Sequence, residues 1–94
     1  MRLFNDIDLE PPLGRHRLGA QVRQMPRPGE PLSVDVLGAG SRTALVESVE
    51  EMSYHGIRGL AWRVRVRLPD DTRVDGLRLS DGHLWFADPR VRPA

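Results

Sequence analysis

The sequence contains no cysteine and no lysine, and it has only two Trp, one Tyr and two Phe among 94 residues. Without cysteine there can be no disulfide, no thiolate zinc site and no cysteine nucleophile, which favours a cytoplasmic protein. Without lysine, the usual phosphate-binding Walker loop is excluded. All 14 basic residues are therefore arginine, which the codon usage of a GC-rich genome explains more simply than selection for function.

The chain also lacks a long apolar run. No segment approaches the roughly 18 apolar residues of a membrane span, and the amino terminus has no apolar stretch of signal-peptide length. The net charge is only +1, so there is no overall positive field to attract nucleic acid or acidic membranes. These features predict a soluble protein that does not act on membranes, with one modest hydrophobic core.

Residues 60–68 carry the clearest pattern in the chain, because apolar residues and arginines alternate along them. In an extended strand, this alternation places the apolar side chains on one side and the arginines on the other. The pattern predicts a half-buried β-strand. Together with the last apolar segment, it predicts a core made largely of Trp62, Val64, Val66, Leu68, Leu84 and Phe86.

Weaker alternation indicates further strands, separated by turn signals such as the proline-rich segment 26–31 and the Asp81-Gly82 pair. The apolar positions change phase at Gly76, since Leu77 and Leu79 do not share the parity of Val74. A glycine at such a change indicates a β-bulge or a barrel bend. The further strand segments are residues 15–25, 32–36, 74–79 and 83–87.

Residues 41–53 are compatible with two structures. Leu45, Val49 and Met52 have helical spacing, so a helix over residues 43–54 is one alternative. The other is a strand that turns Ala44, Val46 and Val49 inward, with a bulge near Glu47-Ser48 and a hairpin loop at residues 54–59. The β-patterns on either side favour the strand.

The predicted fold is mainly β: a small antiparallel sheet or a partly open SH3-like barrel of five or six short strands. The helix over residues 43–54 would make it α+β instead. The predicted organisation is an irregular N-terminal arm (residues 1–14), a single β-rich domain (residues 15–88) and a C-terminal tail (residues 89–94).

No motif supports an enzyme or a cofactor. The Gly38-Ala39-Gly40 sequence lacks the third glycine of a dinucleotide loop, and the neighbouring strand pattern is not that of a buried parallel sheet. His16, His55 and His83 have no metal-ligand spacing, and no serine lies in a nucleophile motif. We therefore predict no catalytic residues, no metal site and no bound cofactor.

One feature suggests binding: arginines project from one face of the predicted sheet at intervals of about 7 Å. Nearby aromatic residues could stack on nucleic-acid bases. The simpler interpretation is that these arginines pair across the sheet with Asp75, Glu47 or Glu51 and keep the sheet soluble. The candidate binding residues are Arg63, Arg65, Arg67, Arg73, Arg78, Trp85 and Tyr54.

The sequence thus supports two hypotheses about function. The first is an adaptor that contacts a protein partner through a sheet edge or a groove of the barrel, since no catalytic set is present. The alternative is nucleic-acid binding through the arginine-bearing face.

Overall fold

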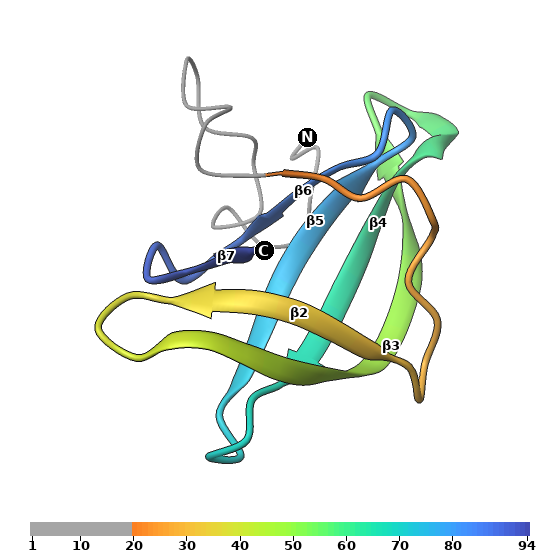
Figure 1. The fold of residues 1–94 in the computed structure, drawn as a ribbon. Helices are drawn as coiled ribbons and strands as arrows, with labels where there is room; N and C mark the ends of the chain where they lie inside the picture. Colours follow the sequence, from red (N-terminus) through yellow and green to blue (C-terminus); the bar gives the residue numbers. More distant parts are fainter. Residues whose placement is uncertain (1–19) are drawn as a thin grey trace.

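A computed structural model of the chain describes residues 20–94, and these residues form seven antiparallel β-strands (Figure 1). They include no helix, and so none that is long and apolar enough to cross a membrane. The predicted arm of residues 1–14 lies outside the described residues, as do residues 15–19. The strands are β1 (Ala20–Gln21), β2 (Pro31–Val36), β3 (Gly40–Tyr54), β4 (Ile57–Arg67), β5 (Arg73–Leu79), β6 (His83–Phe86) and β7 (Val91–Pro93).

The strands form one sheet in the order β1-β6-β5-β4-β3-β2-β7. The sheet curls into a nearly closed barrel, with β2 crossing in front of β4 and β5 in Figure 1. The mainly β prediction is confirmed, and two very short edge strands raise the number of strands above the five or six expected. The closer likeness to an SH3 barrel stays a prediction.

The main core fills the concave face of the sheet. Val64, Val66 and Leu84 are fully buried there, and Leu68 and Phe86 are nearly so. Five of the six predicted core residues are thus confirmed, but the prediction for Trp62 is wrong, because it is only half-buried. Its neighbours across the sheet are the charged residues Glu51 and Arg78 rather than apolar core residues.

Residues 40–54 form the long strand β3, so the helix alternative for residues 43–54 is wrong. The pairing of β3 with β4 shifts between Val46 and Ser48, which confirms the bulge predicted near Glu47-Ser48. The extra residue lets Val46 and Val49 both lie opposite valines of β4 and face the core. Burial of both apolar halves of the strand outweighs the helical spacing of its apolar residues.

Of the two alternatives predicted at Gly76, the β-bulge is wrong, because the residues of β5 from Arg73 to Leu79 pair with β4 in one continuous register. The barrel bend stays a prediction. The change of phase has another cause: Leu77 and Leu79 face the opposite, convex side of the sheet. There they belong to a second apolar cluster. The buried members of this outer cluster are Met52, Ala61 and Leu77.

The segment predicted as a C-terminal tail contains strand β7, which pairs with β2. The Leu37 amide donates to the Arg90 carbonyl (2.7 Å), and the Ala94 amide donates to the Ser33 carbonyl (3.1 Å). These bonds use the side of β2 that β3 leaves free. Val91 also joins the main core, so burial and hydrogen bonding together hold residues 91–94 on the sheet.

Candidate functional site

Carboxylates on neighbouring strands hold most of the predicted arginine row. Arg65 Nε and Nη2 donate to the two carboxylate oxygens of Asp75 (2.7 and 3.2 Å), and these hydrogen bonds raise the pKa of Arg65. Arg73 Nε donates to Glu47 (2.9 Å), and Arg67 lies 3.9 Å from the same carboxylate. The simpler interpretation, pairing of arginines with Asp75 and Glu47 across the sheet, is confirmed for these three arginines.

Arg63 lies further along the same convex face, opposite Glu50 on β3 and Leu77 on β5. Its side chain is half-buried, and its buried Nε has no hydrogen-bond partner among residues 20–94. The inner nitrogen of the guanidinium is therefore shielded from solvent, on the strand position opposite Leu77 of the outer cluster. This position lets the arginine cover apolar surface with its methylene groups.

The aromatic residues predicted as stacking platforms have limited access to solvent. Trp85 is only 5% exposed, and the ring of His83 stacks on it at 5.6 Å between centroids. Tyr54 is half-buried in the outer cluster and meets the ring of His55 edge-on at 4.6 Å. A base therefore has no open face of Trp85 on which to stack.

Arg78 differs from the other predicted site residues because it faces the concave side of the sheet, where it is buried. Its Nη2 donates to the carbonyls of Val22 (2.8 Å) and Arg23 (2.9 Å), and burial lowers its pKa. Arg78 thus ties the segment after β1 to the barrel and does not belong to the arginine face.

Residues 20–94 contain no cluster of three potential metal ligands. His83 Nδ1 lies 3.0 Å from Asp81, whose pKa is lowered chiefly by the hydrogen bond from the His83 amide. This pair stabilises the β5–β6 turn. His16, the third histidine considered as a metal ligand in the sequence, lies outside the described residues.

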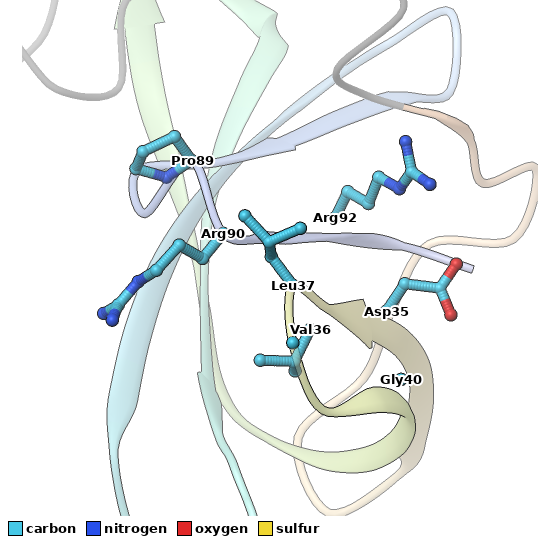
Figure 2. Close-up of a pocket in the computed structure, with 8 residues that line it drawn as sticks. Asp35, Val36, Leu37, Gly40, Pro89, Arg90 and Arg92 are labelled. Atoms are coloured by element: carbon cyan, nitrogen blue, oxygen red, sulfur yellow. The ribbon is translucent and has the colours of Figure 1, made fainter.

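The sequence did not predict a hollow of about 370 Å³ between the β2–β3 hairpin and the segment that leads into β7. Figure 2 shows Leu37 at its centre, between Arg90 and Arg92, whose guanidinium groups point away from one another. A second hollow of about 270 Å³ shares Val36 with the first. We call the two together the hairpin surface; it includes Val36, Leu37, Ala39, Arg42, Leu68, Pro69, Pro89, Arg90 and Arg92.

Leu37 is held in solvent by the geometry of the hairpin turn. Gly38 and Gly40 both adopt a φ of +82°, and the Ala39 amide donates to the Val36 carbonyl (2.9 Å). Glycine adopts positive φ readily, so the turn closes tightly and cannot fold Leu37 back into the core. The side chain is 78% exposed, the highest value among the large apolar side chains of the described residues.

The arginines of the hairpin surface differ in their partners. Arg90 donates to both oxygens of Asp88 (3.1 and 2.9 Å), and these bonds lower the pKa of Asp88. Arg42 donates only to the carbonyl of the preceding residue (2.8 Å). Arg92 makes no side-chain hydrogen bond or ion pair with any residue from 20 to 94, although it lies opposite Asp35 in the register.

Nearby carboxylates limit the positive charge of this surface. Asp35 accepts a hydrogen bond from the Ser41 hydroxyl (3.1 Å), and Asp70 accepts one from the Thr72 amide (3.0 Å), which lowers the pKa of Asp70. Asp35 is thus engaged across the β2–β3 pair, and Asp70 within the β4–β5 turn. Arg42 and Arg92 remain the two cations of the surface that can still take a carboxylate from outside.

Comparison of the chain with protein-family models, with curated proteins and with solved structures found no match. The assignment of function therefore rests on the geometry described above. The only sequence signal for the hairpin surface was an apolar residue, Leu37, next to a glycine in a turn. Arg90 and Arg92 reach this surface because β7 pairs with β2, and the local sequence did not predict β7.

Proposed function

We propose that this chain is a protein-binding module that docks a partner on the hairpin surface. The observation that carries the proposal is Leu37, a large apolar side chain 78% exposed in the middle of a hollow. Contiguous apolar surface in a concave setting is typical of interaction sites, whereas single exposed apolar residues need no explanation. Val36 lines both hollows and, with Pro69 and the small exposed part of Leu68 in the second one, forms their apolar floor.

The size of the surface favours a short segment of the partner. Stable interfaces between two globular proteins are broad and bury about 800 Å² on each side. The two hollows, of about 370 and 270 Å³, instead match the small end of ligand pockets, which have volumes of about 300–1,000 Å³. A short peptide segment needs fewer contacts and binds in a groove through a few anchoring side chains. An apolar anchor beside Leu37 fits this mode.

The free arginines indicate the chemistry of that segment. Arg42 and Arg92 flank the apolar floor and have no carboxylate partner among residues 20–94. Arginine forms its strongest hydrogen bonds with carboxylates and phosphates, in paired geometry. The proposed ligand is therefore an acidic segment with at least one large apolar side chain, and the acids also set its orientation.

A photocrosslinking experiment tests the location of this site. p-Benzoylphenylalanine replaces Leu37 in one variant and Ile57 in another; Ile57 is 55% exposed at the tip of the β3–β4 hairpin and serves as the matched control. In nuclease-treated cell extract, the variant labelled at position 37 is expected to crosslink to a small set of proteins. Added unlabelled wild-type chain should prevent this crosslinking by competition, whereas added Leu37→Asp chain should not. Crosslinking of the same proteins from both positions would contradict the proposal.

Nucleic-acid binding through Arg63, Arg65 and Arg67 is the alternative function. It has less support, because a phosphate has to displace the carboxylates of Asp75 and Glu47 before it reaches two of these arginines. An enzymatic role has no support from a catalytic set. The absence of cysteine remains the ground for proposing a cytoplasmic location, and the small curled antiparallel sheet supports the proposal of an SH3-like barrel.

A further inference from the structure

The second half of β3 has a neighbouring strand on one side only. β3 runs from Gly40 to Tyr54, but β2 pairs with residues 40–45 alone. One further pair of hydrogen bonds joins Val46 to Gly29 and Glu30 (2.8 and 2.9 Å). Beyond that point, β4 is the only strand paired with β3 among residues 20–94. Residues 47–54 therefore form an edge of the sheet that residues 20–94 build.

The backbone hydrogen bonds between β4 and β5 show which residues of β3 point their amides toward β4 and which point them outward. Leu68 N donates to the Thr72 carbonyl and Ser80 N donates to the Leu60 carbonyl, so even-numbered residues of β4 bond to β5. Hydrogen bonding alternates along an antiparallel strand, and odd-numbered residues of β4 therefore bond to β3. The residues of β3 opposite those odd-numbered residues are Ser48, Glu50 and Met52.

Val49, Glu51 and Ser53 consequently point their amides and carbonyls away from β4. No backbone hydrogen bond to these groups comes from the turns or connectors of residues 20–94. The connector between β1 and β2 is bonded near its two ends, at Val22 and Gly29, and its Pro26 and Pro28 have no amide hydrogen to donate. Three consecutive outward positions of β3 are thus ready for strand pairing.

The terminal edge at β7, on the same side of the sheet as this half of β3, is blocked. On β7 the Val91 amide already donates to the Asp88 carbonyl (3.0 Å), and Pro93 has no amide hydrogen. Proline at a sheet edge is a common device against unwanted pairing. The outward positions of β3 contain no proline. The two edges therefore differ in their capacity to accept another strand.

We infer that residues 47–54 of β3 bind an extended, basic segment of a partner protein by strand addition. Pairing with Val49, Glu51 and Ser53 supplies the backbone hydrogen bonds, and the side chains beside the edge select the charge. Glu50 is exposed and makes no ion pair within residues 20–94. Glu51 is held by Arg58 (2.9 Å) and the Gly59 amide, which lower its pKa and keep it ionised.

A second copy of this chain is disfavoured at the same edge in the two registers centred on its acidic residues. Pairing of two β3 edges about a twofold axis centred on Glu50 or Glu51 places that carboxylate opposite its own copy. Like charges directly opposite one another destabilise a strand pair. A basic segment instead brings an arginine or lysine next to Glu50. This site is separate from the hairpin surface and does not depend on ligand binding there.

The test uses the full chain and two fluorescein-labelled twelve-residue peptides, one alternating valine with arginine and the other alternating valine with glutamate. Anisotropy titrations are expected to show binding of the arginine peptide only. In amide hydrogen exchange followed by NMR, Val49, Glu51 and Ser53 are expected to exchange faster than Ser48, Glu50 and Met52 in the free protein. The arginine peptide should then slow exchange at those three outward amides.

The charge-reversal variant Glu50→Arg tests the charge preference of the edge, and a thermal melt checks that this variant folds. It is expected to bind the arginine peptide about fivefold more weakly, which corresponds to the loss of a cross-strand charge pair of about 1 kcal/mol, and to gain affinity for the glutamate peptide. Three results would overturn the inference: no protection of the outward amides, protection confined to another part of the chain, or equal binding of both peptides by the wild-type protein.

Discussion

Replacing Leu84 by alanine is expected to lower the free energy of unfolding by about 3 kcal/mol, because the change leaves a cavity in the centre of the core. Leu84 is fully buried and is one of the largest such side chains in the barrel. It lies on β6 opposite Arg78 of β5 and Ala20 of β1, so neighbouring strands cannot easily move inward to fill the space. Urea denaturation followed by tryptophan fluorescence measures the loss.

Trp62→Ala is the informative comparison for Leu84→Ala. Although the tryptophan is much the larger residue, it is half-buried beside Glu51 and Arg78, and less of its surface leaves water on folding. We expect Trp62→Ala to cost less than Leu84→Ala. A larger loss from Trp62→Ala would mean that the core is centred elsewhere along β4. Circular dichroism serves as the readout for Trp62→Ala, since that variant removes a fluorophore.

Gly76→Ala is expected to destabilise the barrel by about 1–3 kcal/mol, through crowding rather than through a cavity. A Cβ atom at this position would lie 2.8 Å from the Trp85 carbonyl oxygen and 3.0 Å from the ring of Phe86. The nearest contact is backbone of the neighbouring strand β6, which is held in register with β5 at Gly76 itself. Relief therefore requires the two strands to move apart.

The control for Gly76→Ala is Ser48→Ala, a change at an exposed position of β3 that makes no close contact in the core. This variant should change the free energy of unfolding by less than about 0.5 kcal/mol. If Gly76→Ala proves as harmless as Ser48→Ala, then β5 and β6 do not approach one another closely at Gly76.

The strands were largely predictable from sequence because one face of each is buried and side chains alternate between faces. Positions at which the alternation of apolar and polar residues shifts by one residue were harder to interpret. At Glu47-Ser48 the change marks an inserted residue, whereas at Gly76 it marks a transfer of burial to the convex face. The two causes leave the same pattern in the sequence. Only the strand partners, and the second apolar cluster around Leu77, distinguish them.

The site was less predictable than the fold. The neutralisation of Arg65 by Asp75 was foreseeable, because the two residues lie on consecutive strands with opposite charges. The hairpin surface was not foreseeable in the same way, since it forms only when Arg90 and Arg92 are brought beside Leu37 by the pairing of β7 with β2. Such long-range pairing of a three-residue strand has almost no local signal in the sequence.

The central claim is that partners bind to the hairpin surface and not to the arginine face. The most direct measurement is quantitative affinity capture from cell extract, with protein and nucleic acid both counted, for the wild type, Leu37→Asp and the triple variant Arg63→Ala, Arg65→Ala and Arg67→Ala. We expect Leu37→Asp to lose the proteins captured by the wild type, and the triple variant to retain them. Retention by Leu37→Asp together with loss of captured nucleic acid or protein by the triple variant would contradict the claim.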